Sequence, residues 1–367
     1  MAVGQSNGAS GLTTMHRALV EPGLGVRLEE VGVPAPGAGE VLVRSTLVGI
    51  CGSDTHAVAG HHPFLTAPYV PGHEATGVVV SLGAAVDRFT LGQRVLLKPN
   101  VACGACVNCV AGRTNACESL AWIGCDSSRV LAGAMAEYFV APAGNLYPVP
   151  EGLDDKEAAL VECLATPVHA ARIAGSLTGA RVVVLGAGTI GLLSVVAILH
   201  AGAKAVVVTD MEQTKIDRAV RCGALGGVLA STKDLELDVR SMLDGPADVV
   251  FDCVSSERSL SQAIGLLRRA GTLLVVGVPP RRVPINLPFI QDWELRVQGC
   301  AAYTADDMIT AIEIAVAGGV PVAELVSGSY GLQDVALAFM AADADTSGKV
   351  MVTPTGSVPR PLAGANP

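Results

Sequence analysis

The chain has 367 residues, of which 50% are hydrophobic and 16% charged, a composition typical of globular proteins with large buried cores. This length exceeds the usual size of a domain with a single hydrophobic core, so we expect two domains. The net charge of −9 argues against nucleic acid or an anionic membrane as a partner, because both are bound through basic patches. Gly, Pro or a charge interrupts every apolar run before it reaches the length of a membrane span.

The two ends of the chain and its cysteines indicate where the protein works. Residues 1–14 are rich in Gly, Ser, Asn and Thr and lack the features of a signal peptide, so they are predicted to form a flexible tail. Residues 354–367, rich in Pro and Gly, are expected to be a second tail. Ten cysteines without an export signal, four of them within 15 residues, favour metal binding in a reducing compartment over a disulfide framework. We therefore expect a cytoplasmic protein.

Short alternating runs separated by Gly and Pro fill the N-terminal part of the chain. Such runs are typical of β-strands, and many short strands with this punctuation predict a small barrel-like β domain. The expected strands are residues 26–31, 40–48, 75–82, 92–97 and 133–140.

A cysteine, a histidine and a glutamate lie on two glycine-bounded turns within residues 49–77. Cys51 belongs to Gly-Ile-Cys-Gly-Ser-Asp-Thr-His, and His73 and Glu74 belong to Pro-Gly-His-Glu. A thiolate, an imidazole and a carboxylate are ligands that a catalytic zinc uses while it keeps one position open for substrate. A lone cysteine or histidine is more often a core residue, but both together beside turn glycines favour a metal.

Further polar groups extend this candidate site. Ser53 and His56 supply a hydroxyl and a titratable ring that can pass a proton to solvent. A helix is predicted from residue 154 to 173, and within it Glu162 stands among apolar residues. A buried carboxylate is costly unless it is paired or metal-bound, so Glu162 is a candidate for the zinc sphere. An exposed helix face is the alternative, and Cys163 is a rival for the same role.

Four cysteines form a compact cluster that predicts a second metal site. Four thiolates on a short loop can close a tetrahedral zinc site with no open position, which is the structural kind. Such a site folds a lobe that has few large apolar residues of its own. An iron–sulfur cluster is less consistent with the spacing, since its fourth cysteine lies nearer and precedes a proline; free thiols are the other alternative. The cluster consists of Cys103, Cys106, Cys109 and Cys117.

A glycine-rich turn joins an apolar strand, residues 181–185, to an apolar helix, residues 192–200. The turn reads Gly186-Ala-Gly188-Thr189-Ile190-Gly191. In this context the G-x-G-x-x-G spacing indicates a dinucleotide site, because the glycines permit close approach of the backbone and the helix N-terminus holds the pyrophosphate.

The residues that follow indicate which dinucleotide binds. Asp210 ends the next strand, nineteen residues after Gly191. Its carboxylate would accept hydrogen bonds from the adenine ribose and repel a 2′-phosphate, which predicts NAD over NADP. Lys215, one turn further on, tempers this prediction. Val276 and Val278, at the end of a later strand, are expected to contact the nicotinamide.

Apolar strands alternate with helices over the rest of the chain, which predicts a parallel, doubly wound sheet. We expect domains at 15–165 and 166–305, a return to the first domain at 306–353, and a structural-zinc lobe at 103–117. The expected helices are 212–222, 259–269, 305–317 and 332–342, and the expected strands are 205–209, 226–229, 247–254, 271–278, 295–300 and 348–352.

With these motifs in this order, from Met15 to about Thr353, the chain resembles the zinc-dependent medium-chain alcohol dehydrogenase superfamily, most of all its polyol (sorbitol, butanediol) and threonine dehydrogenase branch. The resemblance implies a GroES-like β domain and a Rossmann domain with the active site in the cleft between them. It also implies hydride transfer between a secondary alcohol or polyol and NAD, two zinc ions per chain, and a homodimer or homotetramer.

The resemblance implies roles for individual residues. Asp54 would orient His73, Ser53 would take the alcohol proton, and His56 would relay it outward. Cys51 and His73 would hold the catalytic zinc, with Glu74 and Glu162 as direct or water-bridged partners. Pocket-lining candidates are Phe64, Trp122, Met135 and Tyr303.

Two departures from the branch leave the substrate open. Cys163 stands where the branch usually has Pro, and Gly133-Ala-Met-Ala-Glu-Tyr replaces the more usual Gly-Gly-Phe-Ala-Glu-Tyr. One alternative is an NADPH-preferring aldehyde or ketone reductase on a specialised biosynthetic substrate, against which Asp210 argues. Another is a protein that kept the fold and lost the chemistry, against which the complete set of candidate ligands argues.

Overall fold

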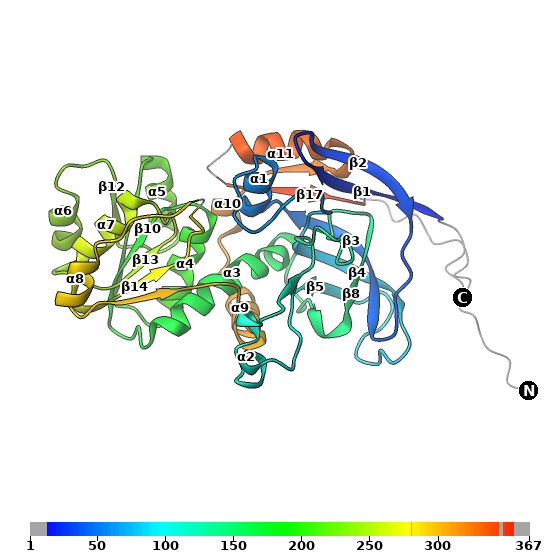
Figure 1. Ribbon diagram of the computed structural model, residues 1–367, viewed down its shortest axis with the longest axis horizontal. Helices are drawn as coiled ribbons and strands as arrows, with labels where there is room; N and C mark the ends of the chain where they lie inside the picture. The colour runs from blue at the N-terminus through cyan, green and yellow to red at the C-terminus, as the bar shows by residue number, and fades with distance from the viewer. Residues whose placement is uncertain (1–12, 280, 345–347, 356–367) are drawn as a thin grey trace, which may run out of the picture.

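The computed structural model describes residues 13–279, 281–344 and 348–355. The two predicted tails lie almost entirely outside these residues. Figure 1 shows two lobes side by side, a β-rich lobe that contains both the first strands and the last strand of the chain, and a lobe built on a parallel sheet. The long helix α3 (Asp155–Ala174) runs between them.

The β-rich lobe contains a seven-stranded sheet in the order β16-β17-β3-β4-β5-β9, with β8 paired to β3. Here β17 lies antiparallel to β3, so the end of the described chain returns to the first domain, as the sequence predicted. The strands are β3 (Glu40–Gly49), β4 (Glu74–Leu82), β5 (Arg94–Leu97), β8 (Tyr138–Pro142), β9 (Leu146–Pro148), β16 (Val326–Gly331) and β17 (Lys349–Thr353). Beside it lie the pairs β1 (Thr14–Glu21) with β2 (Gly25–Gly32) and β6 (Asn100–Val101) with β7 (Ala121–Trp122).

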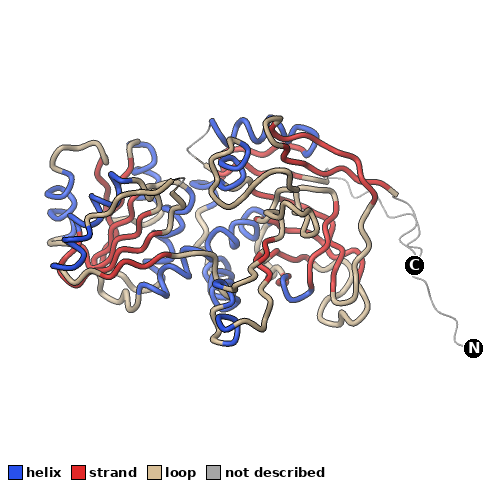
Figure 2. Tube along the Cα trace, viewed as in Figure 1, coloured by secondary structure: helices blue, strands red, loops and turns tan. Residues whose placement is uncertain are grey.

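The second lobe is a six-stranded sheet in the order β12-β11-β10-β13-β14-β15, and every pairing in it is parallel. Numbered along the chain this order is 3-2-1-4-5-6, the Rossmann arrangement. Figure 2 shows its helices flanking the strands. The strands are β10 (Arg181–Leu185), β11 (Ala205–Asp210), β12 (Gly226–Leu229), β13 (Ala247–Asp252), β14 (Leu267–Val275) and β15 (Arg296–Gly299). The helices are α4 (Thr189–His200), α5 (Gln213–Arg221), α6 (Leu235–Leu243), α7 (Glu257–Leu266) and α8 (Leu287–Asp292).

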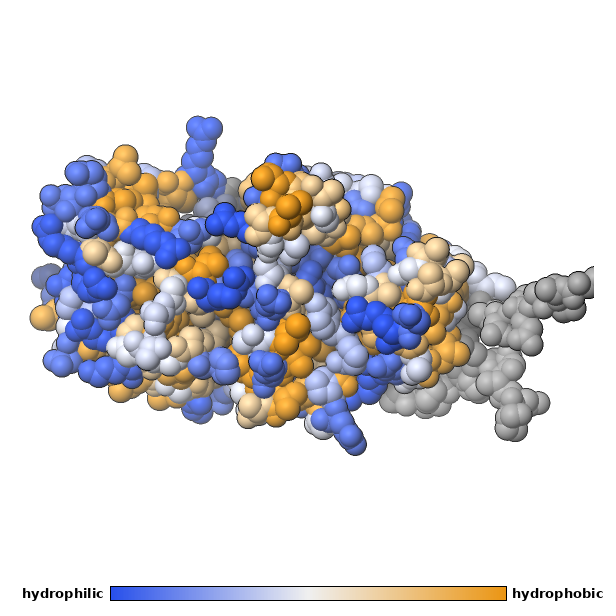
Figure 3. Space-filling view, turned by 90° about the horizontal axis from the view of Figure 1, so that it is seen from below, coloured by the Kyte–Doolittle hydropathy of each residue, from blue (hydrophilic) through white to orange (hydrophobic). Residues whose placement is uncertain are grey.

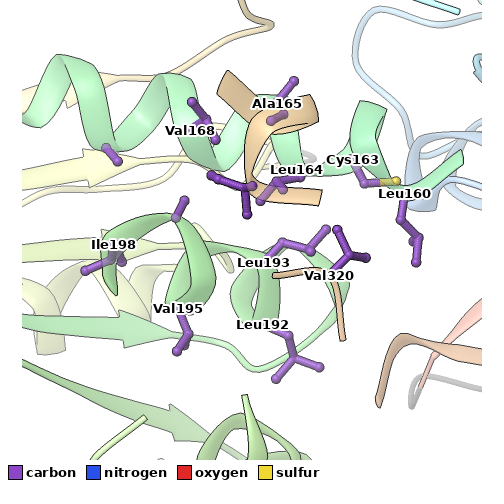
Figure 4. Close-up of a cluster of buried hydrophobic side chains, with 14 of the residues drawn as sticks. Leu160, Cys163, Leu164, Ala165, Val168, Leu192, Leu193, Val195, Ile198 and Val320 are labelled. Atoms are coloured by element: carbon purple, nitrogen blue, oxygen red, sulfur yellow. The ribbon is translucent and has the colours of Figure 1, made fainter. Parts of the chain in front are cut away.

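Helix α3 connects the two lobes. It begins at a capping box in which the Asp154 side chain accepts from the Glu157 backbone and Glu157 reaches back to the Asp154 backbone. It packs on α4 and on α9 (Ala305–Val316). Figure 4 shows apolar side chains of α3, such as Leu164, meeting Leu193 of α4. Because α3 continues across position 165, the predicted domain boundary there stays a prediction.

Several sequence-based expectations were wrong in detail. Residues 52–58 form helix α1 (Gly52–Val58), not part of a turn, and α6 was not predicted. The strand expected from residue 133 begins only at Tyr138, in β8. The helix expected to end at residue 269 stops at Leu266, because β14 begins at Leu267. The remaining short helices are α2 (Val107–Val110), α10 (Val322–Leu325) and α11 (Val335–Ala344), the last preceded by a 3-10 turn.

The surface seen from below intersperses hydrophilic and hydrophobic residues over both lobes (Figure 3). Over the described ranges, the helices are all too short or too polar to cross a bilayer.

Candidate active site

The cysteine, histidine and glutamate of the first motif converge at the end of β3. Cys51 is the N-cap residue of α1, two positions after β3 ends, and Glu74 begins β4, where it pairs with Gly49. One ligand atom each from Cys51, His73 and Glu74 lies within 4.8 Å of the others. Antiparallel pairing of β3 with β4 therefore brings together residues more than twenty positions apart in sequence.

The carboxylate of Glu74 is buried, and its two oxygens have different surroundings. Its Oε1 accepts a 2.6 Å hydrogen bond from the Lys349 ammonium, which is also buried and bonds the Ile50 carbonyl at 3.2 Å. Its Oε2 has no hydrogen-bond partner among the described residues. A Cβ at position 49 would overlap Oε2, so glycine at this position leaves room for the carboxylate. Lys349 was missed by sequence reasoning, since it lies on the last strand, far from either motif.

A buried carboxylate oxygen without a hydrogen-bond partner among the described residues is available to a metal ion. Burial alone would raise the pKa of Glu74, but the Lys349 ammonium and His73 lower it overall. The carboxylate is thus held ionised beside a thiol and an imidazole. This donor set, with sulfur, nitrogen and oxygen atoms together, fits a zinc ion.

A buried carboxylate and a thiol lie beside Nδ1 of the His73 ring. Its Nδ1 lies 3.9 Å from Asp54 Oδ2 and 3.5 Å from the sulfur of Cys125. Asp54 accepts hydrogen bonds from the Tyr69 hydroxyl at 3.0 Å and from the Cys51 backbone at 3.2 Å. With Nδ1 directed toward Asp54, Nε2 remains for a metal. Cys125 is a neighbour that the sequence analysis did not identify.

Glu162 and Cys163 of α3 reach the same site. Both side chains are buried, so the alternative of an exposed helix face is wrong for Glu162. One ligand atom each from Glu74, Glu162 and Cys163 lies within 4.8 Å of the others. The Tyr303 hydroxyl donates a 2.8 Å hydrogen bond to Glu162 Oε1, and burial raises the pKa of Glu162 to about 7. The geometry thus leaves Glu162 and Cys163 as rival ligands.

The groups proposed to move the proton lie on α1. Ser53 is half-buried and His56 is exposed, and residues three apart on a helix are neighbours on its surface. The Trp122 ring meets the His73 ring edge to face at a centroid distance of 6.3 Å, so Trp122 lies beside the site. Met135 is instead fully buried in the β-lobe core, and Phe64 is exposed.

The four-cysteine cluster forms a separate site on the lobe around α2. All four sulfur atoms lie within 4.8 Å of one another. Backbone N–H groups donate to them, as in the bonds from Cys106 to the Cys103 sulfur at 3.4 Å and from Ser119 to the Cys117 sulfur at 3.4 Å. Hydrogen bonds from the backbones of Glu118 and Cys109 lower the pKa of Cys106 to about 6. The thiolate is therefore favoured at Cys106, whereas burial raises the pKa of Cys109 to about 12, so a metal would have to displace that proton.

The glycine-rich turn lies between β10 and α4. Gly186 has a φ of +90°, and a Cβ on Gly191 would overlap the Gly186 carbonyl. A Cβ on Gly188 would meet nothing within 4 Å, so open space lies over this position. Thr189 and Ile190 form the first turn of α4, whose N-terminus faces that space. The turn thus offers backbone N–H groups and room for a pyrophosphate.

Asp210 stands at the carboxyl end of β11, beside a cavity of about 130 Å³ that Gly186 also lines. Its carboxylate accepts hydrogen bonds from the backbones of Ala187 at 2.8 Å and Glu212 at 3.1 Å. Lys215 is ion-paired with Glu212 at 2.9 Å. Of the two valines expected at the nicotinamide, Val276 is buried and Val278 is exposed.

Comparison with known proteins identifies the family. Residues 37–151 match the alcohol dehydrogenase GroES-like domain, and residues 189–317 match the zinc-binding dehydrogenase domain. The chain is 31% identical to the sorbitol dehydrogenase of Bacillus subtilis (strain 168) over 84% of its own length and 88% of that protein. It belongs to the zinc-dependent medium-chain alcohol dehydrogenases, in the polyol and threonine dehydrogenase branch.

Solved structures of relatives share the whole fold of this dehydrogenase. A zinc-binding dehydrogenase from Sinorhizobium meliloti 1021, bound to NADP, superimposes with a TM-score of 0.85 at 32% identity over 93% of this chain and 99% of that one. An alcohol dehydrogenase from E. coli CFT073, complexed with NADH, gives a TM-score of 0.85 at 28% identity over the same shares of the two chains. The dehydrogenase is therefore an oxidoreductase for CH–OH donors that uses zinc and a nicotinamide dinucleotide.

Proposed function

We propose that the dehydrogenase transfers a hydride between a secondary alcohol or polyol and NAD. The observation that carries this proposal is that Cys51 and His73 on one side, and Glu162 on the other, converge on the buried Glu74, whose Oε2 has no hydrogen-bond partner among the described residues. The likeness to sorbitol dehydrogenase supports a polyol as the substrate class.

In the proposed catalytic site, Cys51 and His73 hold the zinc, with Glu74 and Glu162 as direct or water-bridged partners. The zinc, when bound, polarises the alcohol oxygen and lowers the pKa of the hydroxyl. Ser53 accepts the released proton and His56 passes it to solvent. Asp54 acts through His73 by fixing its ring orientation.

Cys163 is a direct competitor for one zinc position. Its sulfur and the Glu162 carboxylate lie in the same group of donors with Glu74, and zinc accepts either kind of ligand. The Tyr303 hydroxyl donates a hydrogen bond to Glu162 Oε1, so Oε2 is the oxygen that Glu162 would offer to zinc.

The second zinc is proposed on Cys103, Cys106, Cys109 and Cys117. The four sulfur atoms lie close enough to share one ion, and the backbone donors around them favour thiolates. Its role there is structural, because a site with four protein ligands leaves no position for substrate.

For the cofactor, we propose NAD with a preference over NADP. The carboxylate of Asp210 beside the open space over Gly188 disfavours a 2′-phosphate. The cation of Lys215 is already paired with Glu212, which weakens its ability to attract that phosphate. Gly186 to Gly191 hold the pyrophosphate, and Val276 and Val278 lie toward the nicotinamide.

We also propose a cytoplasmic homodimer or homotetramer. All ten cysteines lie in the described residues and none forms a disulfide, which suits a reducing compartment. The edge strand β15 and the segment before it expose apolar side chains, including Ile285, Leu287 and Val297. A sheet edge with exposed apolar neighbours is stabilised by pairing with another chain. The domain limits proposed are 15–165, 166–305 and 306–353.

The deciding experiment follows reduced-cofactor absorbance across primary alcohols, secondary alcohols, vicinal diols and hydroxy acids. NAD and NADP are compared, with a chelator-treated sample beside them. NADH formation on diols or secondary alcohols that the chelator abolishes is the expected result. Faster turnover with NADPH on aldehydes or ketones would instead support the reductase alternative. Nucleotide-dependent activity that survives complete zinc removal would contradict the proposed site.

A further inference from the structure

A cavity of about 450 Å³ lies outside the proposed zinc and nucleotide sites. It opens between the segment 112–116 of the four-cysteine lobe, the C-terminal half of α3, and β15 with the loop that follows it. Cavities of roughly 300–1,000 Å³ are the usual size of small-molecule sites. Its charged or titratable lining residues are Arg113, His169, Arg172 and Arg296, and among the described residues no Asp or Glu lines it.

The positive charge in this cavity is only partly neutralised. Arg172 is paired with the buried Asp307 through bonds of 2.6 and 3.0 Å. Arg296 donates to the backbone carbonyls of Ile173 and Ala174, which carry only the partial negative charge of a helix C-terminus. The Arg113 side chain is exposed and makes no ion pair within the part of the chain that the structure describes. Among the described residues of one chain, two guanidinium groups therefore lack a carboxylate, although the net charge is −9. One of them, Arg296, begins β15, the edge strand proposed above to pair with a second chain.

Neutral polar groups complete the lining. The Asn115 amide, the Gln298 amide and Thr304 all border the cavity. The Thr304 hydroxyl already donates to Asp307 and the Asn115 amide to the Ala301 carbonyl, whereas the Gln298 amide uses one of its two hydrogens, in a bond to the Gly299 carbonyl. Guanidinium groups bind phosphate and carboxylate through paired N–H donors, and an amide donor can add to such a site. We propose that this cavity, here called the Arg113 cavity, binds a small polyanion carrying phosphate or carboxylate groups.

One side of the Arg113 cavity is connected to the zinc site. Asn115 donates to the Ala301 carbonyl at 3.0 Å and contacts His169 Nε2 at 3.2 Å. Two residues after Ala301, Tyr303 holds Glu162 through its hydroxyl. An anion bound by Arg113 and Arg296, which flank these contacts, would thus stabilise the segment 299–304, in which Tyr303 lies. Binding itself does not rest on the proposed function; any effect on turnover does.

Calorimetric titration of the full-length, zinc-loaded protein with inorganic phosphate tests the proposal. Ionic strength is held constant, and saturating NADH blocks the pyrophosphate site. Phosphate is used because stronger polyanions such as pyrophosphate or citrate would remove zinc. We expect saturable binding of one phosphate per chain, weakened at least about threefold in Arg113→Gln, which loses one charge-assisted contact.

Lys233→Gln is the matched control, since it removes one exposed positive charge outside the cavity and should leave the affinity unchanged. A second titration with succinate tests the carboxylate form of the ligand. Amide hydrogen exchange across residues 299–304 should slow with phosphate in the wild type and much less in Arg113→Gln. The proposal fails if neither anion binds saturably, or if Arg113→Gln binds as tightly as the wild type. NADH affinity should be equal in all variants. A variant that loses NADH affinity would have a damaged nucleotide site, and this defect would be distinguished from a loss of phosphate binding.

Discussion

At the scale of single residues, the proposed zinc site depends on the surroundings of one carboxylate. Glu74 has one oxygen on Lys349 and one without a partner among the described residues, so its charge is stabilised while an oxygen stays available. Gly49 provides the space for that oxygen. The Lys349 ammonium also makes the zinc site less negative, which should favour binding of an alkoxide substrate.

Replacing Cys51 tests the catalytic zinc directly. Cys51→Ala removes a sulfur ligand, so zinc content should fall from two ions per chain to one and turnover should be lost. NADH binding should persist, because the turn from Gly186 to Gly191 lies on the other sheet. Metal analysis and fluorescence titration measure the two effects. Cys222→Ala, at the end of α5, is the control that should keep both ions. Full turnover in Cys51→Ala would rule out the assignment.

Replacing Lys349 tests its role as the counter-ion of Glu74. The lysine side chain is 5% exposed, so Lys349→Met leaves a buried carboxylate without its cation and should cost about 3 to 5 kcal/mol of unfolding free energy in the zinc-free protein. Adding Glu74→Gln should recover much of that loss, because no buried charge then remains. Denaturant unfolding of the two single variants and the double variant measures the coupling. Strictly additive effects would mean that the pair is not coupled.

At the scale of secondary-structure elements, an ionic cluster around the buried carboxylate of Asp307 connects α3 to α9. Asp307 accepts from His169 and Arg172 of α3, and also from the backbone and hydroxyl of Thr304, which caps α9. The same helix α3 carries Glu162 about two turns before His169. The cluster therefore sets the position of the helix that brings Glu162 to the zinc site.

This cluster predicts a specific pH dependence. Burial alone would raise the pKa of Asp307, but hydrogen bonds from His169 and Arg172 outweigh it and hold the pKa well below its usual range. The stability it contributes is thus present above the unfolded pKa of about 4 and is lost as pH falls below that value. Asp307→Asn should lower the unfolding free energy by about 2 kcal/mol at pH 7. The difference in unfolding free energy between Asp307→Asn and the wild type should shrink as the pH falls from about 4 to about 2.

Urea unfolding from about pH 7 down to the acid transition measures this difference. Asp306→Asn is the matched control, because Asp306 is its exposed neighbour on α9. A constant gap between Asp307→Asn and the wild type at every pH would show that the carboxylate does not titrate as expected.

At the scale of the whole molecule, the proposed catalytic zinc site lies on one sheet, the proposed nucleotide site on the other, and the proposed structural zinc site on the lobe around α2. The long helix α3 joins the two sheets. The four-cysteine lobe reaches the second sheet through Asn115, which bonds the Ala301 carbonyl after β15. The lobe therefore contacts both halves of the molecule. Unfolding of the lobe should lower the stability of the whole protein and not only that of its own loop.

Cys106→Ala tests the role of that lobe. Removing one of four ligands should lower zinc content to one ion per chain and reduce the unfolding temperature by roughly 5 to 10 °C, since the metal contributes folding free energy. The folded fraction should keep its catalytic zinc and measurable turnover. Calorimetry and metal analysis provide the readouts, again with Cys222→Ala for comparison. An unchanged unfolding temperature with two ions retained would exclude a structural zinc on these cysteines.

The sequence by itself determined those features whose residues are close together in the chain. Four cysteines within 15 residues and the turn from Gly186 to Gly191 could be read directly, because metal and phosphate binding there need only local backbone geometry. The alternation of strands and helices likewise predicted the parallel sheet. Helix α1 was not predicted, because seven residues that begin with Gly52 are too few to show the hydrophobic periodicity of a helix.

Tertiary structure alone decided the partners of the ligands. Lys349 meets Glu74 across 275 positions, Tyr303 meets Glu162 across 141, and Cys125 meets His73 across 52. The first contact exists because β17 lies beside β3, a pairing between the two ends of the chain that no local pattern encodes. Which oxygen of Glu74 is free follows from that pairing, because side-chain contacts across a sheet depend on strand order and register and not on distance along the chain.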